Sequence, residues 1–295
     1  MKKIYWGLSV VGLVWLCWYL FMRPYEYEVN FIAKTHPGDV IETIRLWDRS
    51  MANSEIHAVD SFSSVKQHIT LANNNYIYNW HFRLVNDSTT RVTIKISEPS
   101  NSLINKLLIP ISSQPIEEDA AEISKAFYSI LKSHLEITKV RFDGEVYLDS
   151  KFCACTVKET NQTAKANGMM LDYDLIASFI SNYNLTTDGP PMVRILNWDH
   201  NKGKLKFDFC FPIVETDSLP VVSEITYKLY PEVKAIKATY NGNYITSDRA
   251  WYYLTHYAAK QGYTINGLPI EYFYNNPNLG VNEKEWKAEI FLPVK

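Results

Sequence analysis

An unbroken apolar segment near the N-terminus is the strongest pattern in the chain. Residues 4–22 carry no charged side chain, and a helix of this length spans about 28 Å, which matches the hydrocarbon core of a bilayer. A cleaved signal peptide has a similar layout, but here the apolar run is longer and no small-residue cleavage site follows it. The pattern therefore predicts an uncleaved transmembrane anchor over residues 1–24, with a signal peptide as the alternative.

The charges beside the anchor predict its orientation. Lys2 and Lys3 precede the apolar segment, whereas Arg23 is soon followed by Glu26 and Glu28. Because lysine-rich and arginine-rich flanks stay on the cytoplasmic side, the N-terminus is expected inside and the rest of the chain outside the cytoplasm.

Residues 25–142 alternate between apolar and polar positions, as in a half-buried antiparallel sheet. In the clearest run, Tyr76, Tyr78, Trp80 and Phe82 share one face, which is the period of a β-strand. The elements predicted around this run are a strand at 25–34, a helix at 40–47, strands at 65–71 and 92–96, and a long helix at 115–135. This order defines an α+β domain.

Residues 143–295 contain an internal repeat. The segment DGPPMVRI at 188–195 is similar to NGLPIEYF at 266–273, and KFDFCFPI at 206–213 is similar to KAEIFLPV at 287–294. Each copy has the predicted order strand, helix, strand, strand, and the first strand is expected at Val146–Val157 in one copy and at Tyr227–Tyr240 in the other. Two such modules side by side form one sheet with both helices on one face and a groove between the modules.

The ends of the second predicted helix also carry signals. Ser247 is a residue type that caps a helix N-terminus, and Gly262 is one that ends a helix. We therefore expect this helix to lie between the two residues.

Composition and charge exclude several functions. Lys and Arg number 30 against 32 Asp and Glu, for a net charge of −2, and no basic block occurs, so nucleic acid is not an expected partner. The sequence has no phosphate-binding glycine loop, no nucleophile elbow and no zinc-protease motif, and its 7 His are scattered singly. We therefore expect neither a metal nor a cofactor.

The cysteines leave two alternatives open. Cys153 and Cys155 share one face of a predicted strand, but C-x-C binds metal only with partner ligands, and none follows nearby. A disulfide from Cys210 to either residue is the other alternative, available if the domain lies in an oxidising compartment.

The N-terminal pattern resembles the START-like (SRPBCC, polyketide-cyclase-type) helix-grip fold. The resemblance covers most of residues 25–140 and rests on the element order, with Trp80 and Phe82 on a central strand. It implies a curved antiparallel sheet around a long C-terminal helix, with an apolar cavity for a lipophilic ligand. The alternative is that the aromatic side chains simply fill a core.

The C-terminal repeat resembles the GyrI-like domain, a small-molecule effector-binding module also found in AraC-type and multidrug-responsive transcription activators. The resemblance covers residues 143–295 and rests on YNGNY at 240–244, GLP at 267–269 and EIFLPV at 289–294. It implies a groove that binds lipophilic molecules, often cations, against a central acid that matches Glu289. No helix-turn-helix pattern precedes the module, so the chain is expected to have no DNA-binding domain of its own.

Strand parity locates the candidate site. Ala288, Ile290 and Leu292 form one apolar face of the last strand, so Glu289 must point to the opposite side. Asp208 occupies the equivalent step of the first copy. Pseudo-symmetry would bring both acids towards one groove.

Aromatic side chains near these acids could hold a cation through cation–π contacts. The candidates are Tyr227, Tyr240, Tyr244, Tyr272, Tyr274, Trp286 and Phe291. Tyr240 and Tyr244 could gate the groove or only shape the turn between them. The alternative role for Glu289 is an ordinary ion pair with Lys287 or Lys206.

Three functions are compatible with this pattern. The first is a membrane-anchored protein that sequesters or senses a lipophilic or cationic small molecule without turnover. The second is a hydrolase that acts on a strained electrophile through Glu289 and a groove tyrosine. The third is an envelope interaction protein, whose protein partner the sequence leaves open.

Overall fold

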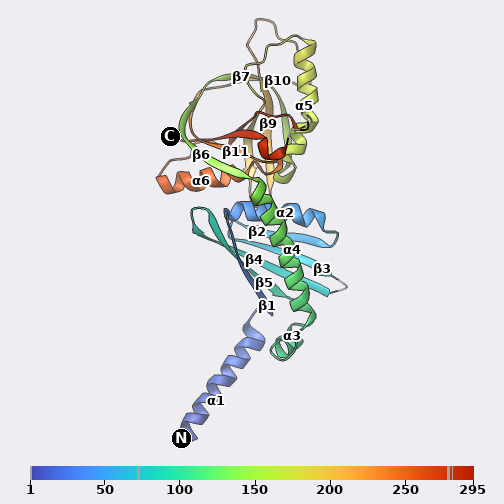
Figure 1. Ribbon diagram of the computed structural model, residues 1–295, viewed down its shortest axis with the longest axis vertical. Coiled ribbons are helices and arrows are strands. Elements are labelled where there is room, and N and C mark those ends of the chain that lie inside the picture. The colour runs from blue at the N-terminus through green and yellow to red at the C-terminus, as the bar shows by residue number, and fades with distance from the viewer. Residues whose placement is uncertain (1, 72–73, 278–279, 281) are drawn as a thin grey trace. The chain divides into compact units, whose positions relative to one another are not determined.

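The chain folds into two compact units, Met1–Lys132 and Ser133–Lys295. The computed structural model describes residues 2–71, 74–277, 280 and 282–295 (Figure 1). Each unit combines an antiparallel sheet with helices, so the predicted α+β class is confirmed.

The N-terminal helix has the extent that the apolar run predicts. Helix α1 (Lys2–Cys17) continues into a π-helical turn, η1 (Trp18–Met22). The stretch Ile4–Met22 is long and apolar enough to cross a membrane, and none of it is buried by the rest of the chain. Its placement in a membrane stays a prediction.

The sheet of the N-terminal unit has five antiparallel strands in the order β1-β5-β4-β3-β2. The strands are β1 (Tyr27–Ala33), β2 (Ser54–Asp60), β3 (Ser64–Leu71), β4 (Asn74–Asn86) and β5 (Thr89–Ser97). The helices are α2 (Pro37–Ser50), α3 (Ser102–Leu108) and α4 (Pro115–Ile137). Sequence patterning predicts each of these elements except β2 and α3.

The aromatic face of β4 is the core of this unit. Tyr76, Tyr78, Trp80 and Phe82 are all buried, and the Trp80 ring lies 4.8 Å from that of Phe127 on α4. Apolar residues of α4 recur on the side that faces the sheet, so burial of both faces drives their packing. These contacts correspond to the core-filling alternative, and the START-like assignment stays a prediction.

The sheet of the C-terminal unit has eight strands in the order β10-β7-β9-β8-β12-β13-β11-β6. These are β6 (Lys139–Leu148), β7 (Lys151–Asn161), β8 (Met192–Asp199), β9 (Lys204–Pro212), β10 (Thr226–Tyr230), β11 (Val233–Asn241), β12 (Ile270–Phe273) and β13 (Lys287–Pro293). The longer helices are α5 (Lys165–Asn182) and α6 (Arg249–Gln261). The predicted domain boundary at 142/143 falls inside β6, which pairs along its length with β11.

The element order strand, strand, helix, strand, strand occurs twice in this unit, from β6 to β9 and from β10 to β13. The first strand of each set pairs with the second strand of the other set: β6 with β11, and β10 with β7. Strands β8 and β12 meet at the centre of the sheet.

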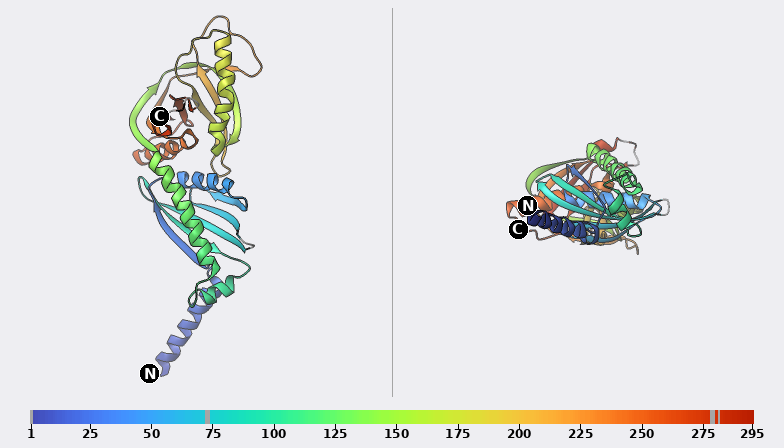
Figure 2. Two further views of the ribbon diagram at one scale, coloured as in Figure 1. Left: turned by 45° about the vertical axis from the view of Figure 1, so that its right-hand side comes forward. Right: turned by 90° about the horizontal axis from the view of Figure 1, so that it is seen from below.

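Helices α5 and α6 lie on the same face of the eight-stranded sheet (Figure 2). On β13, Ala288, Ile290 and Leu292 pack in the core beneath these helices, whereas Phe291 packs on the opposite face. The parity predicted for this strand is therefore confirmed. We call these two sides the helix-covered face and the opposite face.

Helix α6 begins one residue later than the capping pattern predicts. Asp248 occupies its N-cap position and Gly262, with φ of 77°, its C-cap. Gly262 ends the helix as predicted, because glycine tolerates this left-handed conformation. The prediction that Ser247 caps the helix is wrong, since its hydroxyl lies among the buried polar groups described below.

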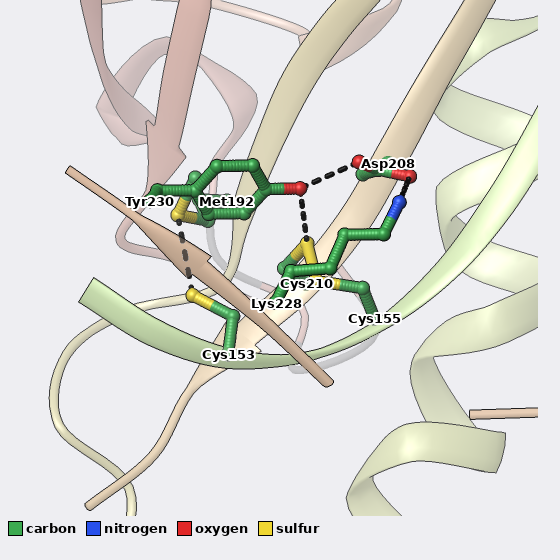
Figure 3. Close-up of a disulfide and its surroundings, with 7 residues drawn as sticks. All are labelled: Cys153, Cys155, Met192, Asp208, Cys210, Lys228 and Tyr230. Carbon is green, nitrogen blue, oxygen red and sulfur yellow. Dashed lines mark hydrogen bonds and ion pairs between the residues drawn. A yellow bond between two sulfur atoms is a disulfide. The ribbon is translucent and has the colours of Figure 1, made fainter. Parts of the chain in front are cut away.

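A disulfide joins Cys155 on β7 to Cys210 on β9, two residues that face each other in the ladder (Figure 3). Cys153 is buried on the same face with a free thiol, and burial raises its pKa to about 12. The disulfide alternative for Cys210 is therefore the one observed, and Cys155 is its partner.

Candidate functional site

An apolar pocket of about 240 Å³ opens on the helix-covered face of the C-terminal unit. Its walls come from α5, from β9, from β12 and from the segment that follows β12. The lining residues are Met169, Met170, Tyr173, Pro191, Phe209, Tyr244, Phe273, Tyr274, Asn275, Asn276 and Pro277. Apolar and aromatic walls with a few amide groups are typical of sites for small lipophilic molecules.

Helical spacing and strand parity both place residues in this pocket. Met169 and Tyr173 are four residues apart on α5 and therefore share one side of the helix. Phe209 and Phe273 occupy the alternate positions of β9 and β12 that face the helices. The pocket thus forms where α5, β9 and β12 come together.

A buried ion pair lies behind the aromatic wall of the pocket. Lys165, at the start of α5, and Glu271, on β12, are both fully buried, with 2.5 Å between Lys165 Nζ and Glu271 Oε2. Glu271 Oε1 also accepts a hydrogen bond of 2.6 Å from the Trp251 indole. Lys165 Nζ donates at 2.7 Å to Ser247 Oγ, which itself lies 3.1 Å from Glu271 Oε1.

Aromatic rings complete the surroundings of the Lys165 ammonium group. It lies 4.7 Å from the centroid of the Trp251 ring and 6.0 Å from that of Phe273. A carboxylate, a hydroxyl and an aromatic face are the groups expected around a bound organic cation. The protein therefore supplies its own cation at this position, and the Phe273 ring beside that cation also lines the pocket.

Tyr244 connects the pocket to the start of β13. Its hydroxyl donates to the Lys287 carbonyl at 2.8 Å and accepts from the Asn275 amide at 3.1 Å. Its ring packs against Phe273 and Trp286, at centroid distances of 4.8 and 5.3 Å. Burial raises the pKa of Tyr244 to about 12, so this phenol stays protonated at neutral pH.

Glu289 lies on the opposite face and is already paired. Its carboxylate forms ion pairs with Lys237 Nζ at 2.9 Å and Lys287 Nζ at 2.8 Å. It also accepts a hydrogen bond of 2.8 Å from the Tyr274 hydroxyl. Burial opposes ionisation, but the hydrogen bonds from Lys287, Lys237 and Tyr274 outweigh it and lower the pKa of Glu289 to about 2. A carboxylate so stabilised is a weak general base.

Asp208 has a comparable environment in the other half of the sheet (Figure 3). It is buried, with Lys228 Nζ at 2.6 Å and the Tyr230 hydroxyl donating at 2.5 Å. The Arg194 guanidinium lies 4.5 Å from the Tyr230 ring. Both predicted acids are therefore ion-paired on the opposite face, and neither lines the apolar pocket.

The predicted aromatic residues are divided between the two faces. Tyr244 and Tyr274 line the pocket, with Trp286 against Tyr244, whereas Tyr272 and Phe291 pack together on the opposite face. Tyr240 is fully buried and donates at 2.6 Å to the Asn243 carbonyl, so it shapes the turn, and Tyr227 donates at 2.6 Å to the Pro220 carbonyl.

The residues that sequence reasoning missed are Lys165, Glu271 and the methionines of α5. Glu271 lies between Ile270 and Tyr272 in a short strand, and the alternation of that strand could have placed it on the side of Phe273. Lys165 gives no such signal, because a lysine at the start of a helix is ordinarily exposed.

A mixed α+β unit, with one antiparallel sheet, two helices on one face and an apolar pocket beside them, is an architecture suited to small-molecule binding. The family comparison agrees: the model of the GyrI-like small molecule binding domain matches residues 158–295. This part of the chain is a GyrI-like domain. No curated protein matches the chain.

Solved structures of several proteins are similar to the C-terminal unit. The C-terminal domain of EcmrR has 15% sequence identity and a TM-score of 0.46, over 54% of this chain and 98% of that one. SAV2435 bound to tetraphenylphosphonium has 15% identity and a TM-score of 0.39, over 52% and 94%. A hydrolase from Listeria innocua has 8% identity and a TM-score of 0.36, over 52% and 92%.

Proposed function

We propose that this chain is a membrane-anchored protein that binds an uncharged lipophilic small molecule in the apolar pocket. The observation that carries the proposal is the combination of apolar walls with an acid, Glu271, that the protein's own Lys165 already neutralises. A ligand in this pocket would contact aromatic rings, thioethers and amides, and none of the lining residues carries a carboxylate. Desolvation of its apolar surface would therefore supply most of the affinity.

A cationic guest, which the family resemblance suggests, has less support. Glu289 and Asp208 have lysine partners on the opposite face, and Glu271 has Lys165. A second cation would have to displace one of these ammonium groups and desolvate itself as well. We therefore place uncharged lipophilic molecules before cations as the ligand class.

The proposed location is a membrane, with residues 23–295 outside the cytoplasm. Residues 4–22 supply the anchor, and the flanking charges favour an inside N-terminus. The disulfide between Cys155 and Cys210 supports the outside location, because such bonds persist in oxidising compartments.

Two finer assignments belong to the same proposal. The repeated element order and the similar segments at 188–195 and 266–273 support an internal duplication in the C-terminal unit. The order strand, helix, antiparallel sheet, long helix supports a START-like N-terminal domain. Neither assignment is needed for the pocket.

A pair of variants on neighbouring residues of α5 tests the pocket. Met170 lines it, whereas Leu171, the next residue, is an exposed leucine. In the full chain in detergent, the uncharged fluorophore N-phenyl-1-naphthylamine should raise the melting temperature and gain fluorescence. Met170→Trp should abolish both effects by filling the pocket, and Leu171→Trp should leave both unchanged.

The comparison between the two variants removes the contribution of the detergent micelle, which is the same for both. An identical response in Met170→Trp and Leu171→Trp would show that the probe binds elsewhere and would overturn the assignment of this pocket.

A further inference from the structure

A short helix beside the anchor carries apolar side chains that face solvent. Over α3 and the turn that follows it, Ile104 is 56% exposed and Ile111 is 82% exposed. The full set of exposed apolar residues in this segment is Leu103, Ile104, Leu107, Leu108 and Ile111. So dense an apolar patch on a soluble surface ordinarily marks a contact with a protein or a membrane.

Hydrogen bonds attach this segment to the end of the anchor helix. Lys106 of α3 is buried, and its Nζ donates to the Arg23 carbonyl at 2.6 Å and the Leu20 carbonyl at 3.2 Å. The Tyr19 hydroxyl donates in return to the Lys106 carbonyl at 3.1 Å. The Lys106 ammonium group therefore binds backbone carbonyls at the C-terminal end of the anchor helix, where carbonyls have no hydrogen-bond partners within the helix.

The position of this attachment decides what the patch faces. Arg23 is the first charged residue after the apolar run, so α3 is joined to the anchor at the level where a transmembrane segment would leave the hydrocarbon core. Figures 1 and 2 show α3 beside that end of the helix.

The charge of the segment fits the same surroundings. From Pro99 to Ile116 the sequence contains no acidic residue, and the ammonium group of Lys106 is turned towards the anchor. Nothing charged in this stretch therefore has to leave water for its apolar side chains to enter lipid. An apolar side that faces away from the rest of the protein is typical of helices that lie in the membrane interface.

We propose that α3 and the turn through Ile111 insert their apolar side chains into the interface of the bilayer that residues 4–22 cross. The proposal rests on the membrane anchor of the proposed function. The lipid is preferred to a protein partner because the patch continues directly from the anchor. Two attachments, one spanning and one interfacial, then hold the base of the N-terminal unit against the membrane.

Depth-dependent quenching in the full chain tests this proposal. Single cysteines are labelled with the environment-sensitive fluorophore NBD at Ile104→Cys, Ile111→Cys and Val85→Cys in a Cys17→Ser background, and at the native Cys17. The chains are reconstituted into phosphatidylcholine vesicles with and without brominated acyl chains. Cys153 is buried and its raised pKa keeps it unreactive in the folded protein.

Val85 is the matched control. It is an exposed apolar residue of the same unit, and it lies near the β4–β5 turn, at the other end of the ladder from the β5 end that leads to α3. At 3.3 Å per residue, β5 separates the two places by about 26 Å.

The expected result is quenching by brominated lipid at Cys17, Ile104→Cys and Ile111→Cys, with blue-shifted emission, and none at Val85→Cys. Quenching at Cys17 without quenching at Ile104→Cys and Ile111→Cys would overturn the inference while leaving the anchor intact. Absence of quenching at Cys17 would instead overturn the anchor, and the inference with it. Equal quenching at Val85→Cys would also overturn the inference, because the contact would not be specific to α3.

Discussion

Lys165 and Glu271 are joined although 106 residues separate them in the chain. Their contact places a lysine ammonium among a carboxylate, a hydroxyl and an indole ring, all out of contact with water. Buried ion pairs of this kind seldom add net stability over apolar side chains of the same size, but the removal of one partner is costly. We therefore expect the pair to affect which ligands the pocket accepts.

Substitution of Lys165 tests how much the removal of one partner of the buried pair costs. Lys165→Met leaves Glu271 without its counter-ion, so the free energy of unfolding should fall by about 3–5 kcal/mol. Lys151→Met, which breaks a pair with the exposed Asp188, is the matched control and should cost no more than about 1 kcal/mol. Denaturant titration of the full chain in detergent measures both values.

The same variant should change ligand preference. With the ammonium group gone, tetraphenylphosphonium should raise the melting temperature of Lys165→Met more than that of the parent chain. If the two shifts are equal, Lys165 does not set the charge preference of the site. The double variant Lys165→Met/Glu271→Met should recover stability and lose the response to the cation.

Glu289 makes the stability of the C-terminal unit depend on pH. Its pKa is about 2 in the folded state and 4.5 ordinarily, so the carboxylate stabilises the fold fully above pH 4.5 and loses this effect as pH falls towards 2. Screening of the partly exposed lysines limits the contribution to about 1 kcal/mol.

Glu289→Gln should therefore lower stability at pH 7 by about 1 kcal/mol, and the difference from the parent chain should shrink towards zero near pH 2. Unfolding curves at pH 7, 4 and 2.5 provide the measurement. Glu215→Gln, in an exposed loop, controls for the lost charge alone. A difference that is constant with pH would contradict the pairing of Glu289 described here.

At the scale of elements, the disulfide between β7 and β9 is the feature with the clearest chemical consequence. It closes a loop of 55 residues, for which the loss of chain entropy in the unfolded state corresponds to about 4 kcal/mol. The bond also joins the outer pair of strands to the centre of the sheet through β9.

Cys155→Ala/Cys210→Ala should lower the free energy of unfolding by up to about 4 kcal/mol, whereas Cys17→Ser should leave it unchanged. In the unfolded parent chain, a thiol reagent should modify Cys17 and Cys153 before reduction and all 4 cysteines after it. Modification of all four without a reductant would contradict the bond.

Sequence patterns located most elements correctly, because burial on one side imposes a period of two on strands and of 3.6 on helices. They failed where a short interruption divides one predicted strand into two. Val146–Val157 reads as a single strand but belongs to β6 and β7, and Tyr227–Tyr240 belongs to β10 and β11, with Pro231 between them. Proline has no N–H for the ladder, so the strand stops there.

At the scale of the whole molecule, the apolar helix predicted to be an anchor and the disulfide make one joint prediction about location. Protease added to intact spheroplasts should digest the two folded units, and a tag fused before Lys2 should stay protected. The folded units should also carry the Cys155–Cys210 bond when isolated from the envelope. Digestion only after lysis would place the folded units in the cytoplasm and overturn the predicted orientation.

The sequence by itself determined the apolar segment at residues 4–22, the α+β class, the GyrI-like C-terminal part and the face to which Glu289 points, since each depends on local periodicity or on a short motif. Only the tertiary structure decided which strands are neighbours: the pairing of β11 with β13 brings Lys237 to Glu289, and the exchange of β10 into the other half of the sheet brings Lys228 to Asp208.

The tertiary structure also decided the site. Lys165 meets Glu271, and Met169 and Phe273 line one pocket, because α5 packs on β7 and β9 beside the central strands. Contacts between residues so distant in the chain depend on how several elements pack at once, and no local pattern encodes that packing.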